Sequence, residues 1–163
     1  MILFGSCLAD EFVIDTVFVV RDFVDHKVET YASALAGRVP AEYLAVSVKP
    51  LYASDGKAED GCVPNKAQSW RLYVGATIDN PVEGMYSFFP CLLRADAKSG
   101  FPRPAVRDAR IITPSARQGF RLNPQTSVRN CQSLWKTVVD QVSAKGLWLG
   151  TYAEMPERRK SHV

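Results

Sequence analysis

The chain has 163 residues, a length typical of one globular domain. Hydrophobic residues make up 47% of it and charged residues 23%, which excludes an intrinsically disordered protein, and no apolar run approaches the roughly 18 residues that cross a bilayer. The net charge of +3 is uneven, because residues 1–60 carry five basic against ten acidic side chains and residues 61–163 carry the other fifteen basic ones.

Two apolar segments at the start predict a β-hairpin. Residues 1–4 are apolar, and residues 12–20 are rich in β-branched and aromatic side chains, which favours strands. Because the sequence opens inside a strand, we expect the native chain to extend before Met1, and we expect the open strand edge to pair with a second copy in a homodimer. The first residues do not form a basic secretory leader, so we expect a cytoplasmic protein without a membrane partner.

The next segment predicts short elements. Thr30 is placed to cap a helix over residues 31–36, and a second short helix is expected after Pro40. The run Ala45-Val-Ser-Val48 predicts a further strand.

The remainder predicts strands and one long helix. The strands are expected over residues 70–74, 85–89, 109–113 and 147–152. The helix is expected over residues 127–145, capped by Ser127 and ended by Gly146, because apolar residues recur there every three or four positions. It should pack across the sheet through Val128, Cys131, Trp135 and Val142.

This order of elements predicts an α+β fold, with a curved, mostly antiparallel sheet or small β-barrel and one long C-terminal helix. A doubly wound parallel sheet would need helices between successive strands. We expect a single globular domain over residues 1–155 and a polar tail over residues 156–163.

Patterns for cofactor or metal chemistry are absent from the sequence. Neither common glycine-rich phosphate loop occurs, and the four cysteines are too widely spaced for a structural zinc site. His26 is expected in a solvated turn, and Cys91 has no evident base to activate it as a nucleophile. We therefore expect no cofactor, no metal and no catalytic residue.

An aromatic-rich stretch over residues 70–89 is the first candidate for a binding site. Aromatic rings can stack on bases, and a turn containing Asn80 offers donors and acceptors for a base edge. The candidate ligand-binding residues of this stretch are Trp70, Tyr73, Asn80, Tyr86 and Phe89. Ser6, at the end of the first apolar segment, joins them.

An arginine-rich stretch follows directly, and its prolines should keep it extended. The planar guanidinium of arginine suits phosphate groups. The candidate phosphate-binding residues are Arg103, Arg107, Arg110, Arg117 and Arg121. The alternative for this stretch is an ordinary solvated surface loop.

Residues 2–6 followed by residues 12–20 resemble the central hairpin of PUA-like domains, the group that includes the EVE, ASCH and YTH domains. The resemblance covers about 20 residues. It implies a small curved β-barrel with flanking helices, and a flipped, modified base held in an aromatic pocket.

These features together predict a nucleic-acid-binding module that recognises DNA, RNA or a nucleotide, with a modified base in an aromatic pocket. Two alternatives stay open. One is an enzyme of nucleotide metabolism or base modification acting through Asp15, Asp79 or Cys91, and the other is a structural or oligomerising domain with an acidic protein partner.

Overall fold

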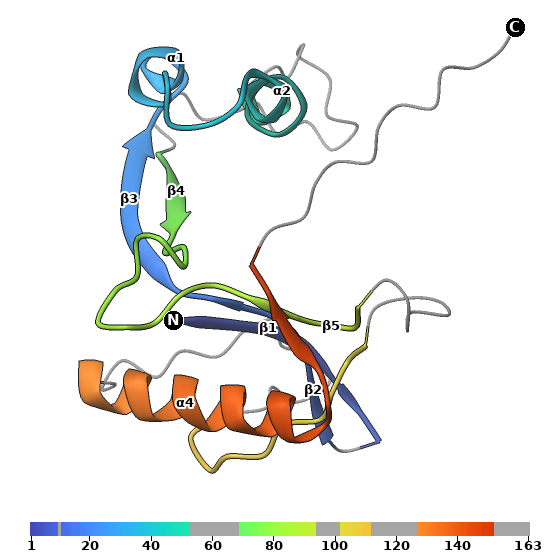
Figure 1. Ribbon diagram of the computed structural model, residues 1–163. Helices are drawn as coiled ribbons and strands as arrows, with labels where there is room; N and C mark the ends of the chain where they lie inside the picture. Colours follow the sequence, from blue (N-terminus) through green and yellow to red (C-terminus); the bar gives the residue numbers. More distant parts are fainter. Residues whose placement is uncertain (10, 53–68, 94–101, 112–126, 152–163) are drawn as a thin grey trace, which may run out of the picture. The chain divides into compact units, whose positions relative to one another are not determined.

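A computed structural model describes residues 1–9, 11–52, 69–93, 102–111 and 127–151 (Figure 1). These residues form small antiparallel sheets and one long C-terminal helix, which confirms the α+β class, and no closed barrel is found among them. The chain divides into unit 1, Met1–Arg21 with Gly75–Val163, and unit 2, Asp22–Val74. Each unit is described by itself.

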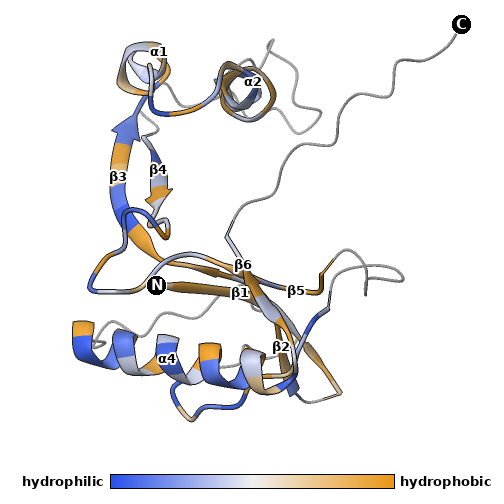
Figure 2. Cartoon of the chain, in the orientation of Figure 1, coloured by the Kyte–Doolittle hydropathy of each residue, from blue (hydrophilic) through white to orange (hydrophobic). Residues whose placement is uncertain are grey.

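Unit 1 begins with the predicted hairpin. Strand β1 (Ile2–Leu8) pairs antiparallel with β2 (Glu11–Phe18), with a β-bulge between Phe4 and Gly5. Figure 2 shows both strands as largely apolar. Most side chains of β1 are exposed, whereas Val13, Ile14 and Val17 of β2 are buried. The homodimer expected through β1 stays a prediction.

The second edge of β2 is also paired. Val13 forms a bridge with Ala105, and Val17 forms one with Phe88, both antiparallel. Strand β5 (Phe89–Cys91) continues from this second bridge and pairs antiparallel with β6 (Trp148–Gly150). β2 therefore lies between β1 on one side and two later segments of the chain on the other.

Helix α4 (Val128–Ala144) covers the core of unit 1 as predicted. The Ser127 side chain accepts a hydrogen bond from the Asn130 amide at 3.2 Å, and Gly146 adopts a positive φ of 71° just after the helix. Val138 and Val142 are fully buried, but the expected core residue Val128 is 58% exposed. The core cluster consists of Ile14, Val17, Val19, Ala76, Met85, Phe88, Val106, Val138 and Val142.

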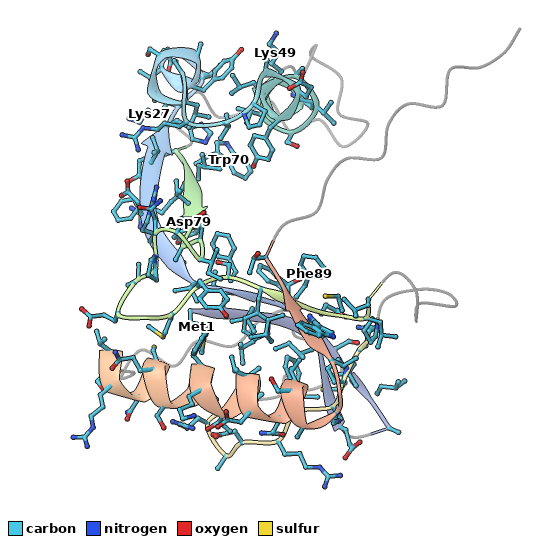
Figure 3. All side chains as sticks on the ribbon, viewed as in Figure 1. Met1, Lys27, Lys49, Trp70, Asp79 and Phe89 are labelled. Carbon is cyan, nitrogen blue, oxygen red and sulfur yellow. The ribbon has the colours of Figure 1, made fainter. Side chains whose placement is uncertain are left out.

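Unit 2 is built on a two-stranded ribbon of β3 (Val20–His26) and β4 (Trp70–Gly75), shown with Trp70 labelled in Figure 3. β3 starts two residues before unit 2. Short helical elements follow it: α1 (Tyr31–Ala34), α2 (Ala41–Tyr43), the π-helical turn η1 (Leu44–Val48) and α3 (Lys49–Tyr52). His26 is 4% exposed rather than solvated, and this burial lowers its pKa.

Several predicted elements of unit 2 are wrong in detail. Residues 45–48 form the π-helical turn and not a strand. Pro50, which follows, has no amide hydrogen for a regular helical bond and crowds the carbonyl four residues before it, so a widened turn accommodates it within the helix. Thr30 stands at the start of α1, but its hydroxyl accepts from the Lys27 amide at 3.1 Å instead of capping the helix.

The strands expected late in the chain are also shorter than predicted. Of residues 85–89 only Phe89 lies in a strand, because Met85 closes a tight turn with Val82. The described residues 109–111 form a turn and no strand, and residues 112 and 113 lie outside the described part. The strands expected to share one sheet belong to three two-stranded sheets.

Candidate functional site

An open hollow of about 550 Å³ lies in unit 1 beside the start of β2. One side is formed by Glu11 and Phe12 of β2, and the other by the segment that follows Ala105. We call it the Arg107 hollow. Its lining residues are Glu11, Phe12, Val106, Arg107, Asp108, Ala109 and Ile111.

The arginine-bearing segment is fixed along β2 by a short antiparallel ladder. The Ile14 amide donates to the Pro104 carbonyl at 3.0 Å, and the Val106 amide donates to the Phe12 carbonyl at 2.9 Å. This register places Arg107 opposite Glu11, and the two side chains form an ion pair. Residues 104–106 are therefore paired with β2 at its edge, while the side chains of Arg103 and Arg107 stay exposed.

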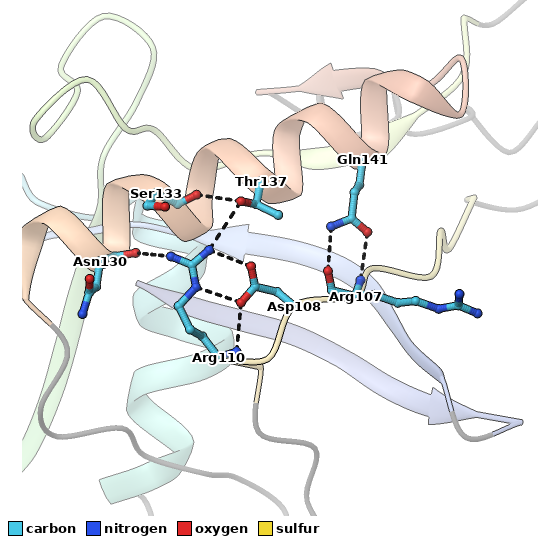
Figure 4. Close-up of polar contacts among 7 residues, drawn as sticks. All are labelled: Arg107, Asp108, Arg110, Asn130, Ser133, Thr137 and Gln141. Carbon is cyan, nitrogen blue, oxygen red and sulfur yellow. Dashed lines mark hydrogen bonds and ion pairs between the residues drawn. The ribbon is translucent and has the colours of Figure 1, made fainter.

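The backbone of Arg107 is held from the other side by α4. The Gln141 side-chain amide accepts from the Arg107 amide at 2.8 Å and donates to the Arg107 carbonyl at 2.9 Å (Figure 4). The side chain of Arg107 nevertheless remains 81% exposed. The hollow thus has at its rim an exposed guanidinium that contacts Glu11 through Nη2.

Arg103 lies four residues before Arg107 and forms a second ion pair across the same ladder. It donates to both carboxylate oxygens of Asp15, and its Nη2 also donates to the Ser6 hydroxyl at 2.6 Å. The hydrogen bond to Asp15 raises the pKa of Arg103. Two of the predicted site residues, Ser6 and Arg103, are therefore brought together.

Arg110 has a different role, because its guanidinium is engaged inside the fold (Figure 4). It donates to both oxygens of Asp108, to the Asn130 carbonyl at 3.3 Å and to the Thr137 hydroxyl at 3.4 Å. The Thr137 hydroxyl in turn donates to the Ser133 carbonyl. Arg110 lowers the pKa of the Asp108 carboxyl to about 2. This network ties the end of the arginine segment to α4.

Replacing Arg110 with methionine is expected to lower the free energy of unfolding by about 1–3 kcal/mol at pH 7, because the Asp108 carboxylate loses its partner. The native pKa of Asp108 is about 2 against an ordinary 3.8, so the pair stabilises the fold above pH 3.8 and its contribution is lost as the pH falls from 3.8 to 2. The difference between variant and wild type in urea unfolding should shrink over that interval.

The control is Arg129→Met, which removes the same charge from an exposed position on α4 and should cost less than about 0.5 kcal/mol. A cost at Arg110 that is the same at pH 7 and pH 2 would contradict the assigned ion pair.

The aromatic candidates of unit 1 lie away from this hollow. The Tyr86 ring is partly buried against the hydrophobic core, edge-on to Trp135 and Phe88 with centroid distances of 5.2 and 6.4 Å. Phe89 lies half-buried in β5, and Asn80 is exposed in a turn with Thr77. The structure does not bring these three residues to the lining of the Arg107 hollow.

The remaining candidates lie elsewhere. Trp70 and Tyr73 belong to β4 of unit 2, and Arg117 and Arg121 lie outside the described residues. Sequence reasoning missed Glu11 and Phe12 as site residues. One signal was available: Glu11 and Asp15 have the same four-residue spacing as Arg103 and Arg107, which matches two extended segments aligned side by side.

Comparisons with known proteins add no identification, since no family model, no curated protein and no solved structure matches this chain. In the described part of the chain, three or more His, Cys, Asp or Glu side chains nowhere group closely enough to hold a metal ion. None of the helices described there has both the length and the apolar character to span a membrane.

Proposed function

We propose that this chain is a nucleic-acid-binding module and that the Arg107 hollow takes one nucleotide. The base would lie against Phe12, and Arg107 would hold the phosphate. The observation that carries the proposal is the guanidinium of Arg107, 81% exposed on a backbone clamped by Gln141, at the rim of a hollow containing an aromatic ring.

The chemistry of the lining supports this assignment. A volume of about 550 Å³ lies within the range of small-ligand sites, and ring stacking contributes roughly 1–3 kcal/mol per base. Glu11 adds a carboxylate whose Oε2 can accept a hydrogen bond from a donor of a base edge. We do not propose Tyr86 as a base contact, because its ring packs against the core.

The finer fold prediction, a curved sheet or small barrel of the PUA-like type, belongs to the same proposal. It is supported by β2, which has partners on both edges. Domains of that type hold a base in an aromatic pocket, and for this reason we include modified bases among the ligands.

The test is fluorescence anisotropy with labelled single-stranded and duplex oligonucleotides between 50 and 200 mM salt. Arg107→Ala is expected to weaken binding about tenfold for all sequences and to reduce the log–log salt slope by about one, because one phosphate contact is lost. Phe12→Leu should weaken binding by a similar factor and leave the slope unchanged, since stacking releases no counterions.

The matched control is Arg129→Ala, which removes an arginine from α4 outside the hollow and should change affinity less than about twofold. Equal losses for Arg107→Ala and Arg129→Ala would indicate a diffuse charge effect and no site at the hollow. Absence of binding to oligonucleotides and mononucleotides at 50 mM salt would overturn the proposed function.

A further inference from the structure

One face of the β3–β4 ribbon in unit 2 carries an organised group of exposed side chains. The Arg71 guanidinium carbon lies 4.0 Å from the centroid of the Phe23 ring, in a cation–π contact. Arg71 also donates from Nε and Nη2 to the two oxygens of Asp25, at 2.6 and 2.8 Å. The guanidinium therefore lies over the Phe23 ring and donates to Asp25 along one edge.

Tyr73 extends this group along β4. It lies two residues after Arg71, which puts it on the same side of the strand, and it acts with Asp25 in raising the pKa of Arg71. Phe23 is 50% exposed and Tyr73 is 47% exposed. We call Phe23, Arg71 and Tyr73 the Arg71 platform.

Core packing does not account for these two aromatic residues. The alternate residues of the ribbon, Val24, Leu72 and Val74, are the half-buried ones, so the ribbon already has a separate apolar side. Aromatic rings on the solvent side of a strand gain little from burial. They do offer flat surfaces to a ligand.

The charges of the platform select among ligands. Asp25 engages both Nε and Nη2 of Arg71, the donor edge that would otherwise bind a phosphate or a carboxylate. The paired charges favour no charged group placed directly on the platform. A neutral planar ring suits the surface best, because it can stack on the exposed rings of Phe23 and Tyr73.

We propose that the Arg71 platform stacks unpaired bases of single-stranded nucleic acid. This inference rests on the proposed function, because it presumes that the chain binds nucleic acid, and it assigns a second contact surface apart from the Arg107 hollow. Stacking of this kind is tolerant of sequence, since every base has a flat face.

Affinity measurements test the platform on the full chain. Phe23→Leu and Tyr73→Leu should each weaken binding of a single-stranded 12-mer about tenfold and leave duplex binding unchanged, because paired bases are not free to stack. Tyr43→Leu is the matched control, since it removes a 40% exposed tyrosine from α2 of the same unit and should change affinity less than about twofold. Circular dichroism verifies that each variant is folded.

Photo-crosslinking distinguishes binding at the platform from binding at the hollow. An oligonucleotide containing 5-iodouracil crosslinks to aromatic side chains on which it stacks, and trypsin places Phe12 in residues 1–21 and Phe23 in residues 22–27. A crosslink in residues 22–27 that persists in Arg107→Ala supports the platform even if the hollow does not bind.

Crosslinks confined to other peptides, with unchanged affinity in Phe23→Leu and Tyr73→Leu, would overturn the platform and leave the proposed function standing. Tyr73-dependent binding of a proline-rich peptide without any crosslink in residues 22–27 would also overturn it, in favour of a protein partner. Absence of all oligonucleotide binding would overturn both proposals.

Discussion

Trp135→Ala is expected to lower the free energy of unfolding by about 3–5 kcal/mol. The Trp135 ring packs edge-on against Tyr86 at 5.2 Å and against Phe88 at 6.1 Å, and its Nε1 donates to the Tyr86 carbonyl at 2.9 Å. Alanine removes the ring contacts, opens a cavity beneath α4 and leaves that carbonyl without its donor.

Urea unfolding followed by circular dichroism measures this loss. Trp135→Phe should lie between wild type and alanine, because it keeps a ring but loses the hydrogen bond, which contributes about 1 kcal/mol. Val128→Ala on the same helix is the control, since Val128 is 58% exposed and its loss should cost less than about 0.5 kcal/mol. Similar stabilities for Trp135→Ala and Val128→Ala would show that α4 does not pack through Trp135.

Gly5→Ala is expected to destabilise the protein by about 2–4 kcal/mol, although it adds only one methyl group. A β-carbon at Gly5 would collide with the backbone carbonyl of Val13 and would lie 2.7 Å from Cζ of the Phe12 ring. The side-chain ring can move, but the Val13 carbonyl belongs to the hairpin partner strand and cannot move without disturbing β2.

Gly84→Ala provides the comparison for this substitution. A β-carbon there meets no atom within 4 Å, and the only cost is the positive φ of 77°, about 1 kcal/mol. Thermal or urea unfolding should therefore rank Gly5→Ala well below Gly84→Ala in stability. The opposite order would show that β1 and β2 are not paired in this register. Gly5→Ala should also weaken ligand binding at the Arg107 hollow, because it displaces Phe12.

Elements with strong local signals could be predicted from the sequence. The helix expected over residues 127–145 is α4, because its capping serine, its apolar spacing and its terminal glycine all act within a few residues of one another. The β1–β2 hairpin was predictable for a similar reason, since its two apolar segments are close in the chain.

Elements with weak or conflicting local signals could not be predicted from the sequence. Residues 45–48 include two β-branched valines, but they continue the helix that starts after Pro40. Residues 109–111 look apolar enough for a strand, but Asp108 accepts from the Arg110 amide and turns the chain there. In both places, neighbouring residues outweigh the intrinsic preference of a short segment.

For the candidate site, too, the sequence determined one part and the tertiary structure another. The sequence by itself determined which side chains could meet a phosphate, and Arg103, Arg107 and Arg110 were equal candidates at that level. Only the tertiary structure decided among them, since Arg110 is held by Asp108 and α4 whereas Arg107 remains exposed beside Phe12.

What the sequence determined about this protein is therefore local: its α+β class, the hairpin, the capped helix and the arginine-rich stretch. Only the tertiary structure decided the register that places Arg103 opposite Asp15 and Arg107 opposite Glu11 across separations of 88 and 96 residues. The physical reason is that backbone pairing between distant segments depends on how the whole chain closes around its core, and no pattern confined to either segment encodes that closure.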